Sequence, residues 1–190
     1  EGRTDGYDLS PSVSARVSTR LQARIGLGYT RDHEDNQWFG NFTDEGSGDT
    51  HYSFGRLDQR TVSLRTRISY AATPDLTFEF YGQPFVSTGR YSALRELSAT
   101  PDAASYDDRY QPYEPPASEP REFMFAQVRT NAVLRWEYLP GSTLFLVWAH
   151  GRQDDSETFS DRSWTRDYRD LFDLHPDNTF LIKVAHWLSR

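Results

Sequence analysis

Apolar and polar side chains alternate along several stretches of this chain, which is the pattern of a β-strand with one apolar and one polar side. The clearest stretch runs from Gln59 to Tyr70, and a second runs from Met124 to Tyr138. In the first stretch one side holds Val62, Leu64, Ile68 and Tyr70. The opposite side holds Ser63, Arg65, Arg67 and Ser69. Each stretch therefore predicts a strand whose two faces meet different environments.

Seven such strands can be placed along the chain, and the connections between them alternate between short and long. The predicted strands span residues 8–17, 21–31, 52–72, 76–86, 122–139, 143–152 and 178–188. Three connections, at residues 18–20, 73–75 and 140–142, carry the Pro, Gly and small polar residues that tight turns need. The other three are long, at residues 33–50, 87–121 and 153–177. Loops of more than about 12–15 residues are uncommon in compact domains, so this rhythm points to a particular architecture.

Bacterial outer-membrane barrels combine short periplasmic turns, long outer loops and strands that are apolar outside and polar inside. We therefore expect an all-β fold, an antiparallel up-and-down meander of about seven strands, with residues 1–190 as one partial domain. This meander would be the carboxy-terminal part of a transmembrane β-barrel in the bacterial outer membrane. The residues expected to face lipid are Val62, Leu64, Ile68, Val128, Leu134 and Trp136. The residues expected to face the lumen are Arg65, Arg67, Arg129, Arg135 and Glu137.

The number of strands has a further implication, because single-chain bacterial barrels have an even number of strands, at least eight. A set of seven predicts that the first and last strands are edges of an open sheet. Upstream barrel strands, missing from this chain, are then expected as partners. Pairing between residues 13–17 and 180–184 would instead define a small, self-contained barrel.

Composition narrows the choice of fold and partner. Hydrophobic residues make up only 36% of the chain but aromatic residues 15%, which is unlike a disordered sequence. No apolar run approaches the ~20 residues of a transmembrane helix. With no cysteine, neither disulfides nor Cys-ligated metals are expected. The formal net charge of -7 argues against nucleic acid as a partner.

No catalytic, metal-binding or cofactor-binding motif is recognisable, so we expect no cofactor and lean against an enzyme. Five histidines are present, but none has a second ligand at helical or strand spacing. The most suggestive group is Tyr106, Tyr110 and Tyr113 among the prolines of the second long loop. Exposed tyrosines can stack on sugar rings, which makes glycans candidate ligands. The alternative for these tyrosines is a loop that folds down onto the rim of the barrel.

Three segments carry a resemblance to a known family: residues 57–97, residues 131–148 (NAVLRWEYLPGSTLFLVW) and the closing FLIKVAHWL. They resemble the barrel region of an uncharacterised family of bacterial outer-membrane proteins. The resemblance implies a barrel of unknown function that usually follows an amino-terminal domain similar to family 9 carbohydrate-binding modules. That domain is not in this chain, and the resemblance supplies no catalytic residues.

These observations lead to one expected role and to alternatives from other classes. The expected role is a pore, an uptake component or a membrane anchor in contact with outer-membrane lipid, linked to carbohydrate binding or uptake. One alternative is a surface hydrolase or a carbohydrate-binding module with a β-sandwich fold, since alternation in any single strand also fits a sandwich. Another is a complete small barrel with an enzymatic Ser/His/acid set, which the sequence does not assemble.

Overall fold

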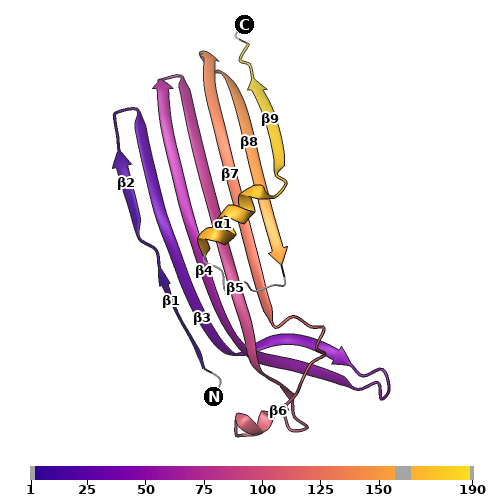
Figure 1. Ribbon diagram of the computed structural model, residues 1–190. Helices are drawn as coiled ribbons and strands as arrows, with labels where there is room; N and C mark the ends of the chain where they lie inside the picture. Colours follow the sequence, from indigo (N-terminus) through magenta and orange to yellow (C-terminus); the bar gives the residue numbers. More distant parts are fainter. Residues whose placement is uncertain (1–2, 157–163, 189–190) are drawn as a thin grey trace.

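The computed structural model describes residues 3–156 and 164–188, which form a single antiparallel sheet of nine strands (Figure 1). The strands are β1 (Thr4–Leu9), β2 (Ser12–Arg16), β3 (Leu21–Thr43), β4 (Thr50–Thr73), β5 (Leu76–Leu97), β6 (Tyr110–Pro112), β7 (Glu122–Leu139), β8 (Ser142–Ser156) and β9 (Asp177–Ala185). Two short helices accompany them, the 3-10 helix η1 (Asp107–Arg109) and α1 (Trp164–Asp173). The expected all-β antiparallel meander is thus confirmed, with more strands than predicted.

The strands pair in the order β1-β3-β4-β5-β7-β8-β9, while β2 also pairs with β3 and β6 with β5. The first predicted strand is therefore two, β1 and β2, interrupted at Ser10 and Pro11. Proline has no backbone N–H to donate and cannot continue a hydrogen-bonded ladder. Its carbonyl still accepts a hydrogen bond from the backbone of Leu27, at 3.0 Å, which keeps both pieces on the same edge of the sheet.

The long connections are shorter than predicted because the strands run on into them. Residues 33–50 were expected to be a loop, but β3 and β4 continue as a hairpin that projects beyond the rest of the sheet, and only residues 44–49 turn (Figure 1). Register shifts between Glu34 and Gln37 and between Trp38 and Gly40 disturb the alternation of β3. Because these bulges interrupt the alternation of apolar and polar residues, the sequence predicted a loop here.

The other two predicted loops also contain regular structure. In residues 87–121, β5 continues to Leu97, and η1 and β6 follow. In residues 153–177, β8 continues to Ser156 and α1 occupies much of the remainder, while residues 157–163 lie outside the described residues. The short turns are as predicted, and the one after Leu139 uses Gly141 with φ +76°, a conformation that favours glycine.

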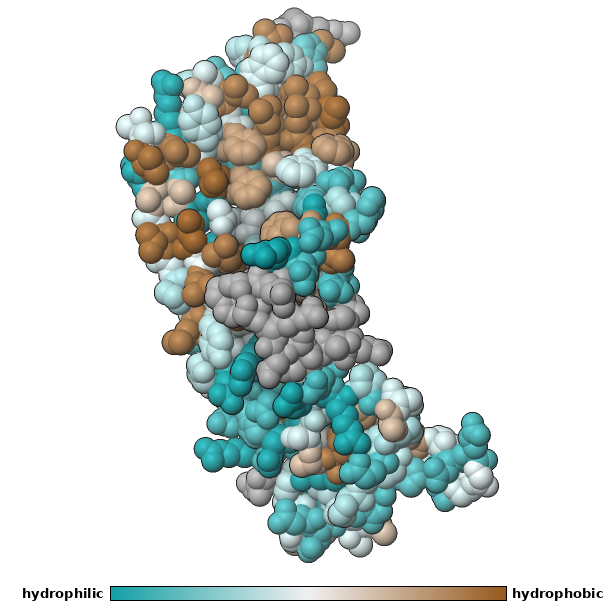
Figure 2. All heavy atoms as spheres, in the orientation of Figure 1, coloured by the Kyte–Doolittle hydropathy of each residue, from teal (hydrophilic) through white to brown (hydrophobic). Residues whose placement is uncertain are grey.

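One face of the sheet carries a continuous apolar surface. Directly paired residues lie on the same face, and the register aligns Tyr70, Phe78, Leu134, Leu146 and Ile182 in one row across five strands. We call this surface the apolar belt; it comprises Ile25, Leu27, Val62, Leu64, Ile68, Tyr70, Phe78, Phe80, Leu134, Leu146, Ile182 and Val184. Hydrophobic residues gather in the half of the molecule with the tight turns, and hydrophilic residues gather toward the loops (Figure 2).

Helix α1 crosses the apolar face at the loop-side border of the belt (Figure 1). Its Leu171 is 1% exposed and packs with Val86, Ala126 and Val128 into the core cluster, flanked by Met124 and Leu174. Val128 was expected to face lipid; it lies on the expected face, but the helix covers it. No described helix is long and apolar enough to span a bilayer.

The sheet is open at both sides within the described residues. β1 and β2 pair only with β3, and β9 pairs only with β8. The prediction that the first and last strands are edges is therefore confirmed. The described strands also lie in one sheet and not in two packed sheets, as a β-sandwich would require.

Candidate functional site

The face opposite the apolar belt is polar and carries the five residues predicted to share one face. Register pairs place Arg65, Arg67, Arg129 and Arg135 on this face, with Glu137 two residues beyond Arg135 on the same strand. Arg135 and Glu137 pair at 3.0 Å near the tight turn, where the Glu137 carboxylate also accepts a hydrogen bond from the Gly141 backbone at 3.2 Å. The Arg135–Glu137 pair therefore stabilises the turn, and Arg135, unlike Arg65 and Arg67, has a carboxylate partner within the described part of the chain.

Arg65 and Arg67 belong to a group that the sequence did not reveal. Arg67 on β4 lies directly opposite Arg24 on β3, and Arg65 lies opposite Gly26. We call Arg24, Arg65 and Arg67 the arginine cluster. All three side chains are exposed. The missing member, Arg24, could not be found from the sequence because only the register of β3 against β4 brings it beside Arg67.

The arginine cluster has little to neutralise it. The Arg24 Nε donates to Ser14 Oγ at 2.7 Å, and the Arg67 guanidinium lies 5.7 Å from the centre of the Tyr81 ring. Among the side chains that the structure describes, none of the three forms an ion pair with a carboxylate. Like charges directly opposite each other on a sheet are destabilising, so the cluster costs stability as it stands.

Two hollows adjoin the arginine cluster. One of about 480 Å³ is lined by Ser14, Arg16, Gln22, Arg24, Arg67 and Ser69, among others. The other, of about 370 Å³, is lined by Ser10, Ser12, Arg24, Gly26, Arg65, Arg67 and Tyr81, among others. Arg24 and Arg67 line both hollows, and Gly26 leaves room beside Arg65. Arg129 lies farther across the face, on β7 opposite Gly151.

The predicted ligand-binding tyrosines lie at the loop end, where they contact the protein itself. Tyr106 and Tyr110 come together at 5.3 Å between ring centres, and the Arg95 guanidinium lies 5.2 Å and 4.4 Å from them. Their hydroxyl groups accept hydrogen bonds from Arg95 at 2.8 Å and from Asn36 at 2.6 Å. Tyr113 lies elsewhere, stacked on His51 at 4.6 Å. All three rings are partly buried, and these contacts fold the second long connection onto the projecting hairpin.

Two histidines at the loop end, outside the apolar belt, each lie between two carboxylates. His51 Nδ1 lies 2.5 Å from Glu96 Oε2, and its Nε2 lies 3.4 Å from Asp44 Oδ2. The hydrogen bond to Glu96 is the main reason that the pKa of His51 is raised. Glu96 is itself 8% exposed and accepts a hydrogen bond from Gln111 at 2.6 Å. Sequence spacing gives no sign of this pair, because the two residues come from different strands.

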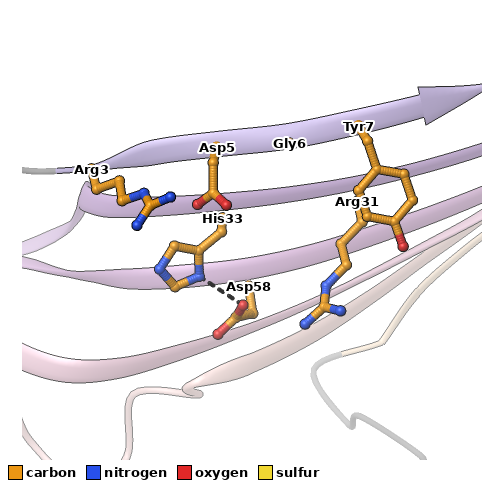
Figure 3. A pocket seen from close by; sticks show the side chains of 7 residues that line it. All are labelled: Arg3, Asp5, Gly6, Tyr7, Arg31, His33 and Asp58. Atoms are coloured by element: carbon orange, nitrogen blue, oxygen red, sulfur yellow. Dashed lines mark hydrogen bonds and ion pairs between the residues drawn. The ribbon is translucent and has the colours of Figure 1, made fainter.

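His33 has a similar arrangement at the edge of the sheet. Its Nδ1 lies 2.8 Å from Asp58 Oδ1 and its Nε2 3.4 Å from Asp35 Oδ1, and the bond to Asp58 raises its pKa. His33 and Asp58 line a hollow of about 440 Å³ together with Arg3, Asp5, Gly6, Tyr7 and Arg31 (Figure 3). Charges of both signs face this hollow. Among the described residues, no group of three or more His, Asp or Glu side chains is arranged to hold a metal ion.

The fold and its polar face define a class of protein: an antiparallel meander with one apolar and one arginine-bearing face. Residues 1–189 match the family model described as a domain of unknown function, DUF5916, and the chain belongs to this family. No curated protein and no solved structure matches the chain.

Proposed function

We propose that this chain forms part of the wall of a transmembrane β-barrel in the bacterial outer membrane, with its polar face lining a pore. The observation that carries the proposal is the apolar belt, an exposed apolar surface on one face of a single sheet. Ile25, Leu64, Ile182 and Val184 are 54%, 38%, 71% and 61% exposed. Contiguous exposed apolar surface of this extent marks contact with a partner or a membrane.

The height of the belt fits a bilayer. On β4 the belt runs from Val62 to Tyr70, eight steps that rise about 26 Å at about 3.3 Å per residue. A strand tilt of about 40° reduces this rise to about 20 Å, which fits within the apolar band of about 25 Å of outer-membrane barrels. Tyr70 and Trp136, 42% and 46% exposed, lie at its turn-side border, where such barrels carry aromatic girdles.

The open edges support closure by further strands. In hydrocarbon, an unpaired backbone polar group costs several kcal/mol, so β1, β2 and β9 require partners there. Upstream strands of the same protein would supply both edges and close the barrel. In that arrangement outer-membrane lipid contacts the belt, and the arginines of the opposite face line the interior.

The side-chain contacts and the single sheet support a pore wall better than they support a β-sandwich module, a hydrolase or a glycan-binding site. The described strands form one sheet without the second sheet of a sandwich module or hydrolase. The rings of Tyr106, Tyr110 and Tyr113 are engaged within the protein, which leaves little free ring surface for stacking on a glycan. The hollows beside the arginine cluster, by contrast, open on the face that would line the interior.

The test uses the complete protein produced in bacterial cells. We expect it in the outer-membrane fraction, with an electrophoretic mobility that changes on heating. A soluble protein with no heat-dependent mobility would contradict the proposal.

Topology can be tested with single cysteines in a cysteine-free version of the complete protein. Gly46→Cys lies in the turn of the projecting hairpin, where an added side chain meets no atom within 4 Å. Asp75→Cys lies in an exposed tight turn at the opposite end of the sheet. An impermeant maleimide should label the first in intact cells, and the second only after lysis. Labelling of Asp75→Cys in intact cells would contradict this orientation.

A further inference from the structure

We propose that the arginine cluster binds the oxyanion group of a small solute, a phosphate, sulfate or carboxylate, inside the barrel. The inference rests on the proposed function, because it takes the polar face as the interior surface. It goes further by naming the chemical class of solute and the residues that select it.

The first argument is the geometry of the cluster. Arg24 and Arg67 are directly opposite each other on neighbouring strands, which places their Cβ atoms about 4.5–5.5 Å apart. Because their side chains start this close together, the guanidinium groups of Arg24 and Arg67 can bind the same anion. The guanidinium group presents its N–H donors in a planar fork that matches the oxygens of carboxylates and phosphates.

A second argument is that no carboxylate compensates the cluster within the described side chains, although the chain is acidic overall. The formal net charge is -7, with 28 Asp and Glu residues against 21 Lys and Arg. Carboxylates are therefore abundant, yet those that form described ion pairs meet other partners, such as Arg56, Arg90 and Arg121. An anionic ligand would supply the charge that the arginine cluster lacks.

Room and additional donors are present beside the guanidinium groups. The hollow of about 370 Å³ next to Arg65 is lined by the hydroxyl-bearing residues Ser10, Ser12 and Tyr81. Gly26, directly opposite Arg65, has no side chain to fill that space. A phosphate-sized group therefore fits between the cluster and the hydroxyls.

Direct binding is the primary test, because it does not require an open pore. The complete protein in detergent would be titrated with inorganic phosphate in a calorimeter, with chloride at equal ionic strength as the reference. We expect saturable binding of phosphate, weakened at least about tenfold in the Arg24→Gln/Arg67→Gln double variant, because that variant loses two charged donors of strong hydrogen bonds to the anion. Arg67→Gln alone should weaken phosphate binding less than the double variant does. Arg67→Lys keeps the charge but loses the planar fork, so its affinity should lie between those of Arg67→Gln and the unmodified protein.

Arg90→Gln is the matched control. It makes the same change of charge as Arg67→Gln alone, but Arg90 lies outside the cluster and pairs with Glu122 at 2.7 Å. Its phosphate affinity should equal that of the unmodified protein. Equal loss in Arg90→Gln and in Arg67→Gln would show nonspecific charge attraction and overturn the proposal. An unchanged affinity in the double variant, or no binding beyond the chloride reference, would also overturn it.

Conductance provides the second measurement. In planar bilayers under a salt gradient, the reversal potential of the unmodified protein should indicate preference for anions, and phosphate should reduce the chloride current. Both effects should decline in the double variant but persist in Arg90→Gln. A cation-selective pore would overturn the proposal and leave the barrel intact. Phosphate binding by a protein that does not insert into membranes would retain the oxyanion site and reject the barrel.

Discussion

In the loop-side half of the sheet, arginines meet carboxylates: Arg56 lies 2.8 Å from Asp35, and Arg90 lies 2.7 Å from Glu122. In the half with the apolar belt, the arginine cluster on the opposite face meets no carboxylate among the described side chains. The two halves belong to the same strands and share one backbone ladder. The difference teaches that charge is neutralised in the loop-side half and at the tight turn, where Arg135 pairs with Glu137, and is left available in the arginine cluster between them.

The largest effect should come from placing a charge within the apolar belt. Leu64→Arg puts a guanidinium at mid-depth of the proposed membrane band, at a cost of about 2–4 kcal/mol, so assembly should fail or drop steeply. Tyr52→Arg makes a comparable change at an exposed position, 49% accessible, in the projecting hairpin, and should be tolerated. Quantifying heat-modifiable protein in outer-membrane fractions compares the two. Equal tolerance of both changes would remove the distinction between the halves.

The next effect concerns α1, which lies at the border of the two halves. Leu171→Ala truncates a side chain of α1 that is only 1% exposed. It should weaken docking by about 2 kcal/mol, the low end for a buried leucine because one side of the helix is open to relax. Amide exchange in residues 169–173 should accelerate, while exchange in the strands below stays slow. Phe172→Ala is the control: its ring is exposed and lies 5.8 Å from the Arg152 guanidinium, and its loss should cost less than about 1 kcal/mol.

The loop-side half should respond to pH, and the half with the belt should not. The folded pKa of His51 is raised above 6.5 by its bond to Glu96. Its contribution to stability is therefore fully present below about pH 6.5 and is lost as the pH rises through the raised pKa. Asp44, Glu96 and Tyr113 are the ionisable groups that face it.

Amide hydrogen exchange can be followed from pH 6 upward and corrected for the intrinsic exchange rate. The projecting hairpin of β3 and β4 should lose protection as the pH rises. His51→Gln should flatten this dependence. The arginines of the other half stay charged throughout this range, so protection of residues 62–70 should not change. A parallel loss of protection in both halves would argue against a local histidine switch.

The smallest effects should differ in sign. Arg90→Gln breaks an exposed ion pair and should lower the free energy of unfolding by less than about 1 kcal/mol. Arg67→Gln removes the repulsion from Arg24 and should leave stability unchanged or raise it by about 0.2–1 kcal/mol. Urea unfolding of the protein in lipid vesicles measures both. A loss of stability in Arg67→Gln would mean that the arginine cluster has a structural partner.

The sequence predicted the elements whose alternation is undisturbed. β7 has the predicted bounds, and β4, β5 and β8 begin within two residues of the predicted starts. It failed where alternation is broken: the bulges at Glu34 and Trp38 made the end of β3 look like a loop. Helix α1 has a signal in the sequence, because Trp164, Tyr168, Leu171 and Phe172 recur at helical spacing. The Asp and Arg residues around them favoured a hydrated loop instead.

The candidate site was predictable only in part, because it depends on register. Period two placed Arg65 and Arg67 on one face, but it carries no information about which residue of β3 lies opposite Arg67. The same limit applies to His51 and Glu96, which are 45 positions apart in the sequence. Side-chain pairs between strands cannot be inferred until the strands are aligned.

The order of the strands also bears on how the chain folds. Except where β6 and the segment before it intervene, each long strand pairs with its neighbours in the sequence. Contacts between neighbouring segments form quickly because little loop entropy is lost in making them. The sheet can thus grow hairpin by hairpin from any point along it, and each intermediate presents an unpaired edge that can recruit the next strand or a foreign one. In the proposed barrel, the edge at β9 must meet a strand that is distant in the sequence, so closure should be the slow step and the one that most needs assistance from an assembly factor.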